Sequence, residues 1–137
     1  VCMDQFPSAA HLASWAAMCP GNYESAGKRT RGTTRKGNRL LRVALVQAAW
    51  ATTRTNTFLA AQYRRWVKRM GSRKALVAVG HSILVMAYHI LKQRVAYHEL
   101  GADFFDRQQQ DTQRRRLIQK LEALGLKVTV ENLEVTA

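Results

Sequence analysis

The sequence has very few acidic residues in its first 98 positions. Asp4 and Glu24 are the only two, and 16 lysines and arginines accompany them, so this part carries a formal charge of +14. Residues 99–137 hold seven acids and six bases, which gives them a charge of −1. A charge of one sign on this scale attracts polyanions. Nucleic acid is the leading candidate, an anionic membrane surface is the second, and a solvated basic surface without a partner is the third.

Cysteine is also scarce, with Cys2 and Cys19 alone among 137 residues. The two form no CxxC pair and lie near no histidine at metal-ligand spacing, which argues against a zinc site. A chain of this length buries a core without a disulfide, so we expect both thiols to be reduced, as in a cytoplasmic protein. The sequence does not open on a basic segment followed by an apolar run, so we expect no secretory leader. No metal site is expected from the remaining donors, which are four histidines and the scattered acids Glu99, Asp103, Asp106 and Asp111.

Apolar periodicity predicts a mainly α fold, a helical bundle with a short β-element at the C-terminus. Ser8, Asn38 and Ser72 are suitable N-caps for three of the helices. The predicted helices cover 9–19, 39–55, 58–70, 73–94 and 103–125, and the alternating pattern of 126–135 predicts a strand.

The shift in charge divides the chain into two parts. The first, 1–98, is a basic helical core that contains a loop over 20–37. The second, 99–137, contains the last helix and the strand, and is either part of the same domain or an oligomerisation tail. A lone strand needs a partner, which the second interpretation would supply from another chain.

The segment 73–94 is apolar on nearly every side. Seventeen residues separate Lys74 from Lys92, which is the short limit for a membrane span. Gly80 and His81 interrupt the run, so we predict the central buried helix of a bundle instead.

Aromatic and basic side chains on the predicted helices have two interpretations each. Trp15, Trp50 and Trp66 lie on apolar stripes, which favours core packing over base stacking. A basic group on the helix over 58–70 either follows phosphates or faces water, and the residues alone leave this open. Its members are Arg64, Arg65, Lys68 and Arg69.

The stretch PGNYESAGKRTRGTTRKGNRLLR, residues 20–42, is predicted to be a long loop with seven basic residues. It is not a nucleotide-binding P-loop, because five residues separate Gly21 from Gly27 and Arg29 stands where Ser or Thr would ligate magnesium. Its glycines allow backbone N–H groups to approach an anion, and its cations would hold phosphates. Ser25 in this setting is either a nucleophile toward phosphorus or a turn residue.

Spaced motifs along nearly the whole chain carry a resemblance to a known family. They are LASWA at 12–16, Pro20-Gly21, Ser25, RKGN at 35–38, RRWVKRMGSRKALVAVGHSILVMAYHIL at 64–91, YHELGADFFD at 97–106 and RRRLIQKLEALGLKV at 114–128. With these motifs the sequence resembles the C-terminal domain of the insertion-sequence transposase family IS one-ten, which also includes the Piv-type DNA invertases.

The resemblance implies a DNA transposase or site-specific recombinase that cleaves and rejoins strands. In such a family an N-terminal RuvC-like domain binds divalent metal, Mg²⁺, and the C-terminal domain contributes a serine nucleophile within a homo-oligomer. Some members also use a structured guide RNA. By motif position the nucleophile is Ser25, and the residue after it, commonly glycine in the family, is Ala26 here. The residues implied to lie near the DNA or guide backbone are Lys28, Arg29, Arg31, Arg35, Lys36, Asn38, Arg39 and Arg42.

Under this interpretation the chain holds no cofactor and no metal. The protein is expected in the cytoplasm, associated with the nucleoid, and without a membrane partner. The chain alone is then expected to bind nucleic acid but not to cleave it, because the metal-binding domain supplies the missing chemistry. Glu24 stands next to Ser25 but is not favoured as its general base. The main alternative is a basic helical module that only binds DNA or RNA, in which Ser25 is a turn residue. A membrane-surface helix over 58–70 is a further alternative.

Overall fold

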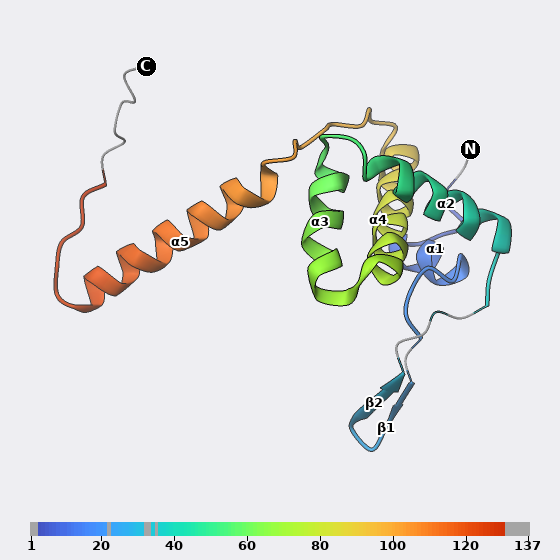
Figure 1. The fold of residues 1–137 in the computed structure, drawn as a ribbon, viewed down its shortest axis with the longest axis horizontal. Helices are drawn as coiled ribbons and strands as arrows, with labels where there is room; N and C mark the ends of the chain where they lie inside the picture. The colour runs from blue at the N-terminus through green and yellow to red at the C-terminus, as the bar shows by residue number, and fades with distance from the viewer. Residues whose placement is uncertain (1–2, 22, 32–33, 35, 131–137) are drawn as a thin grey trace. The chain divides into compact units, whose positions relative to one another are not determined.

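The computed structural model describes residues 3–21, 23–31, 34 and 36–130. The chain divides into two compact units, Val1–Ala102 and Asp103–Ala137. Helices dominate both, so the prediction of a mainly α fold is confirmed (Figure 1). The elements are α1 (Ala9–Trp15), β1 (Tyr23–Ser25), β2 (Lys28–Arg31), α2 (Arg39–Thr52), α3 (Phe58–Met70), α4 (Ser72–Gln93) and α5 (Phe104–Ala123).

Helix α4 is the centre of the first unit and packs against α1, α2 and α3, which confirms its prediction as a central bundle helix (Figure 1). Val79 is fully buried and Tyr88 is nearly so. A Cβ atom at Gly80 would lie 3.3 Å from the carbonyl oxygen of Leu45, so the absence of a side chain there lets α2 approach closely. The buried residues of α4 are Ala75, Leu76, Val79, Gly80, Leu84 and Tyr88.

Among the described residues, one helix is long and apolar enough to cross a membrane, and it is α4. Length and composition are the only grounds for this assignment, and the core helix of a globular protein meets the same criterion. The contacts of α4 with three other helices are those of such a core helix.

The N-terminal segment is held on α4 by polar contacts. The Tyr88 hydroxyl donates to the carbonyl oxygen of Phe6 at 2.9 Å. The same hydroxyl accepts from Lys92 Nζ at 2.8 Å. Because Phe6 and Tyr88 are 82 residues apart, these contacts join the two ends of the unit.

Helix α1 ends at Trp15, four residues before its predicted end at residue 19. Ala17 has a φ of 52°, which is the left-handed conformation that stops a helix. The Ala17 N–H donates to the Ser14 carbonyl, and the Met18 N–H donates to the Ala13 carbonyl, both at 3.0 Å. This pair of bonds is a Schellman motif, so an alanine performs the role that the prediction gave to Pro20 and Gly21.

The predicted bounds of α3 are confirmed, and its end at Gly71 leads directly into α4. The prediction that Ser72 caps α4 is wrong, because Ser72 is the first residue of the helix. Its hydroxyl lies 3.2 Å from the hydroxyl of Tyr63 instead. The cap of α2 is as predicted, since Asn38 Oδ1 accepts from the Leu41 N–H at 3.1 Å.

Two of the three tryptophans are outside the core, contrary to the prediction. Trp15 is 57% exposed and Trp50 is 52% exposed, and only Trp66 packs against a core cluster. Trp15 lies against the ring of Phe6 with centroids 5.6 Å apart. Helix α2 presents Leu45 and Ala49 to the core, and Trp50 lies on another face.

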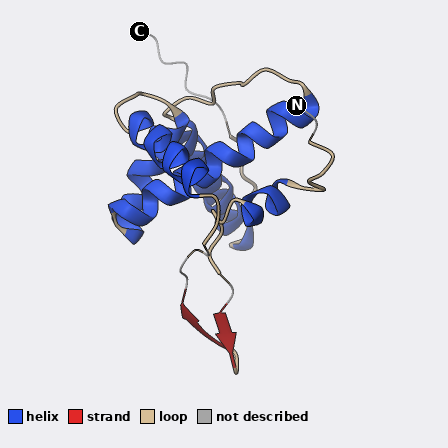
Figure 2. Cartoon of the chain, turned by 90° about the vertical axis from the view of Figure 1, so that its right-hand side faces the viewer, coloured by secondary structure: helices blue, strands red, loops and turns tan. Residues whose placement is uncertain are grey.

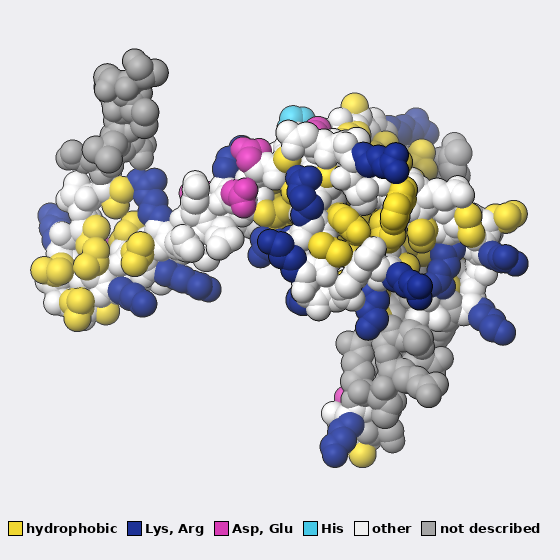
Figure 3. All heavy atoms as spheres, viewed as in Figure 1, with side chains coloured by type: hydrophobic (Ala, Val, Ile, Leu, Met, Phe, Trp, Pro, Cys, Tyr) yellow, Lys and Arg dark blue, Asp and Glu magenta, His cyan; other side chains and the backbone are white. Residues whose placement is uncertain are grey.

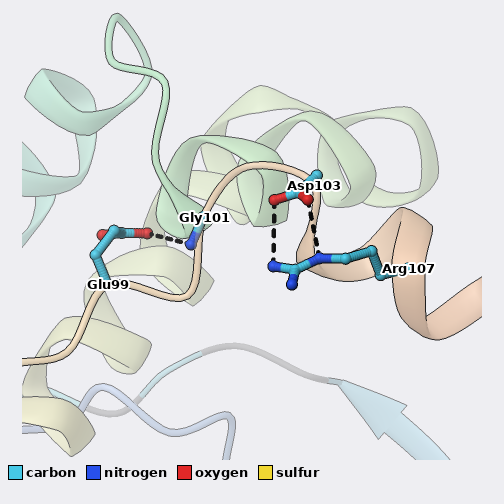
Figure 4. Close-up of polar contacts among 4 residues, drawn as sticks. All are labelled: Glu99, Gly101, Asp103 and Arg107. Atoms are coloured by element: carbon cyan, nitrogen blue, oxygen red, sulfur yellow. Dashed lines mark hydrogen bonds and ion pairs between the residues drawn. The ribbon is translucent and has the colours of Figure 1, made fainter. Parts of the chain in front are cut away.

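The second unit contains α5, whose predicted apolar residues are largely uncovered within it. Leu117 is 61% exposed and Leu124 is 76% exposed. Arg107 and Asp103 form an ion pair one turn apart, with Nε and Oδ2 at 2.9 Å (Figure 4). The predicted C-terminal strand is not found over 126–130, and 131–137 lie outside the described residues.

Glu99 was interpreted as a surface charge, but its carboxylate also caps α3 from a distance in sequence. Glu99 Oε1 accepts from the Phe58 N–H at 2.7 Å and from the Gly101 N–H at 3.1 Å, and Figure 4 draws the second of these bonds. Its Oε2 accepts from the Tyr97 hydroxyl at 2.7 Å. Burial alone would raise the pKa of Glu99, but these hydrogen bonds outweigh it and lower the pKa below its usual value. Burial and the bond to Glu99 raise the pKa of Tyr97 to about 12.

Glu99→Ala is expected to lower the free energy of unfolding by about 1 kcal/mol at neutral pH, because α3 loses its cap and solvent screens the rest of the effect. Because the pKa of Glu99 is lower in the folded protein than in the unfolded chain, its ionised carboxylate stabilises the fold above the pKa of the unfolded chain. This stabilisation is lost as the pH falls through the pKa of the folded state. Urea unfolding at pH 7 and at about pH 3 should therefore show the difference from the wild type shrinking in acid. Glu122→Ala changes the net charge equally and should leave the first unit unaffected. An undiminished difference in acid would contradict the role of the ionised carboxylate.

Candidate functional site

The predicted loop over 20–37 contains an antiparallel β-hairpin that the sequence interpretation missed. Strands β1 and β2 pair Ser25 with Lys28 and Glu24 with Arg29, so only Ala26 and Gly27 form the turn. Their φ values are 50° and 73°. Two-residue hairpin turns of type I′ require positive φ at both positions. Figure 2 shows the hairpin projecting from the helices.

The two arms of the hairpin are joined at its base, and one contact holds that base against the helical body. Pro20 and Thr34 form an isolated antiparallel bridge. Gly37, three residues after Thr34, lies against the turn that ends α1. A Cβ atom added to Gly37 would overlap the Cβ of Ala17 and lie 3.1 Å from the carbonyl oxygen of Ala16. The serine hairpin, residues 20–37, is therefore anchored where α1 ends and α2 begins.

Ser25 is the last residue of β1, directly before the turn. Its partner across the hairpin is Lys28, which is exposed. Directly paired residues share one face of a hairpin, and successive residues of a strand belong to opposite faces. Position 25 therefore shares a face with a cation, and Glu24 occupies a position on the other face, paired with Arg29.

The predicted nucleic-acid contacts divide between the hairpin and the start of α2. Arg35 lies outside the described residues. Asn38 uses its side-chain oxygen to cap α2. Arg42 is half-buried, whereas Arg39 and Lys36 are exposed. Lys28, Arg29 and Arg31 are on β2, Lys36 lies between β2 and α2, and Asn38, Arg39 and Arg42 are at or within the first turn of α2.

Metal-ligating and thiol groups add nothing to this site. Over the described ranges, no group of three or more His, Cys, Asp or Glu side chains could hold a metal ion. The resemblance assigns Mg²⁺ to the RuvC-like domain, and the described residues of this chain offer no such group of side chains to hold it. Cys19 is a free, half-buried thiol whose pKa is raised by burial, and Cys2 lies outside the described residues.

A sequence signal for the hairpin was present. Ala26-Gly27 is a two-residue turn between YES and KRTR, and an x-Gly pair between short strands is a hairpin pattern. The pattern is weak here, because alanine seldom adopts positive φ and charged residues replace the usual apolar alternation.

Ala26→Gly is expected to stabilise the hairpin by about 0.5–1 kcal/mol, because glycine adopts a φ of 50° without the strain that alanine carries. Hydrogen exchange of the hairpin amides is the measurement, and their protection should rise. Gly27→Ala is the matched control, since nothing lies within 4 Å of a Cβ at that position and only the φ of 73° opposes it. It should lower the protection. The same direction of change in both variants would contradict the assignment of positive φ to this turn.

Comparison with known proteins identifies the part of the chain that carries this hairpin. Residues 2–64, slightly under half of the chain, match the model of the transposase IS116/IS110/IS902 family. Neither the curated proteins nor the solved structures that were compared include a significant match. The matched residues contain α1, the serine hairpin, α2 and the first half of α3. Residues 2–64 therefore carry the transposase IS116/IS110/IS902 family domain, which is the C-terminal serine-containing domain of such transposases.

Proposed function

We propose that Ser25 is the nucleophile of a DNA strand-cleavage and rejoining reaction and that the serine hairpin presents it to a DNA phosphate. The observation that carries the proposal is the pairing of Ser25 with Lys28 beside a two-residue turn, at the end of a hairpin that projects from the helices (Figure 2). A cation across the strand would attract the phosphate and stabilise the charge that develops on its oxygens. The match of residues 2–64 to a transposase family supports DNA as the substrate.

The proposed step is a displacement at phosphorus. The Ser25 hydroxyl oxygen forms a bond to phosphorus, and its proton passes to a base. The bond between phosphorus and the leaving DNA oxygen breaks, and that oxygen takes up a proton. A hydroxyl of another DNA end then gives up its proton and attacks the serine phosphodiester. The bond between phosphorus and the Ser25 oxygen breaks, that oxygen takes up a proton, and the strands are rejoined.

The general base is proposed to come from outside this chain. Glu24 is adjacent in sequence, but position 24 belongs to the face of the hairpin opposite position 25. A separate RuvC-like domain with divalent metal, a homo-oligomer and a structured guide RNA complete the proposal, together with a cytoplasmic location at the nucleoid. These follow from the resemblance of the motifs to the family.

The test joins this chain to a RuvC-like domain of the same family and incubates it with duplex DNA and Mg²⁺. The covalent product is digested with protease, and mass spectrometry identifies the peptide that carries a nucleotide. Attachment to the peptide containing Ser25 is the expected result. Cleavage with no adduct, or an adduct on another residue, would favour the alternative in which this chain is only a nucleic-acid-binding module.

A further inference from the structure

The corner between α3 and α4 carries four exposed cations within seven residues. Lys68 and Arg69 are in the last turn of α3, and Arg73 and Lys74 are in the first turn of α4. We call these four residues the corner patch. The sequence contains no Asp or Glu between Glu24 and Glu99, so α2, α3 and α4 offer the corner patch no acidic side chain.

A purely structural role does not explain this arrangement. The first turn of α4 has no acidic residue and no side-chain cap, and two cations at the positive end of a helix destabilise it. On α3, Arg64 precedes Lys68 by four residues, and like charges at this spacing repel. Only Lys68 and Arg69 gain from their position at the carboxyl end of α3. An arrangement that costs stability is better explained by an anionic ligand.

The position of the corner patch indicates which anion it meets. Figure 1 shows the α3–α4 corner at the end of the first unit from which the hairpin projects. Figure 3 shows Lys and Arg side chains gathered along the same margin. The turn between α2 and α3, which contains Arg54, lies at the opposite end (Figure 1). A DNA duplex that reached the hairpin would extend over this end of the unit, where its next phosphates would meet cations.

We propose that the corner patch binds the backbone phosphates of duplex DNA, as a second contact surface beside the serine hairpin. The proposal rests on the proposed function for its ligand, since it takes DNA as the substrate. It does not depend on Ser25 chemistry. The contact is electrostatic, so it adds affinity without sequence preference and makes binding more sensitive to salt.

The test compares two single charge reversals of equal size, Lys74→Glu at the corner patch and Arg54→Glu at the opposite end. Affinity for a duplex of about 30 base pairs is measured at several salt concentrations. The log of the affinity is then plotted against the log of the salt concentration. Each lost phosphate contact makes this negative slope shallower by about 0.9. Replacing all four residues of the corner patch with alanine should make the slope shallower by about 2–4 and weaken binding at least about tenfold at low salt. Lys74→Glu should weaken binding, and Arg54→Glu should have much less effect.

A second readout separates lost binding from lost folding. Lys74→Glu places an acid at the positive end of α4, so it should raise Tm by about 1–3 °C while it weakens DNA binding. Equal losses of affinity in Lys74→Glu and Arg54→Glu would overturn the proposal, because only the net charge would then matter. Weaker binding of a hairpin RNA with unchanged binding of duplex DNA would overturn it in favour of RNA. Failure of the Ser25 proposal would leave these salt slopes unchanged, so the two outcomes are distinguishable.

Discussion

Ser25→Ala should abolish the covalent protein–DNA adduct and lower strand cleavage at least about 1000-fold in the chain joined to its RuvC-like domain, because removal of a nucleophile leaves only binding and charge stabilisation. DNA affinity should stay within about twofold, since the cations that attract phosphates remain. The thermal stability should also be unchanged. Gel separation measures the loss of the adduct, and quantification of nicked DNA measures the loss of cleavage.

Two controls make this outcome specific to Ser25. Ser14→Ala removes an exposed hydroxyl from α1 but keeps the Ser14 carbonyl that accepts from the Ala17 N–H, and it should leave cleavage intact. Ser25→Cys retains a nucleophile of similar size and should form a thiol-linked adduct that turns over slowly. Cleavage that survives in Ser25→Ala would place the chemistry in the partner domain. The hairpin would then be a DNA contact only.

Gly37→Ala should displace the serine hairpin and lower strand cleavage about 100-fold, because misplacement of a reacting group by about 1 Å costs on this order. The added Cβ would overlap the Cβ of Ala17, which is buried and held by the Schellman motif that ends α1. The carbonyl carbon of Ala16 lies 3.2 Å away and is backbone, so it gives little room. The free energy of unfolding should fall by about 2–3 kcal/mol. Adduct formation and urea unfolding measure the two effects.

The double variant Ala17→Gly with Gly37→Ala tests this cause directly. It moves the methyl group from one side of the contact to the other, and glycine suits the φ of 52° at position 17. Much of the lost activity and stability should return in the double variant, and Ala17→Gly alone should be close to neutral. Additive losses in the double variant would show that the contact between these two residues is not what positions the hairpin.

The bundle was predictable because its signals are local and agree with one another. Apolar spacing and Gly71 defined α3 to the residue, and the Asn38 side chain caps α2 as its type suggests. The uniformly apolar composition of 73–94 indicated the central helix, since such a segment must be covered on all sides. The division of the chain into domains at residue 98 stays a prediction.

The errors concern features that depend on the rest of the fold. Helix α2 has apolar residues on two faces, one with Leu45 and one with Leu40 and Trp50, and spacing alone does not say which face meets α4. The end of α1 depends on an alanine with positive φ, for which the sequence has no signal. The cap from Glu99 to Phe58 spans 41 residues, so no local pattern could announce it.

The candidate site was located through motifs and not through local structure. The position of Ser25 and the nearby cations were named from the sequence, but the loop was expected to be irregular, whereas it contains a hairpin. The pairing of Ser25 with Lys28 and the contact of Gly37 with Ala17 follow from register and packing, which the sequence does not contain. The roles of these residues stay predictions.

The hydrogen bond between Tyr88 and Phe6 also has a consequence for the order of folding. Helices α3 and α4 are joined by Gly71 alone, so they can pair early at little entropic cost. The N-terminal segment that includes α1 reaches Tyr88 of α4 only by closing a loop of 82 residues, from Phe6, which makes the docking of α1 a late event. The serine hairpin is anchored at the end of α1, so it acquires its fixed position only in that last step. Partly folded chains would then have the basic helices in place before the nucleophile is positioned, and pulse-labelling hydrogen exchange should show α3 and α4 protected ahead of the hairpin.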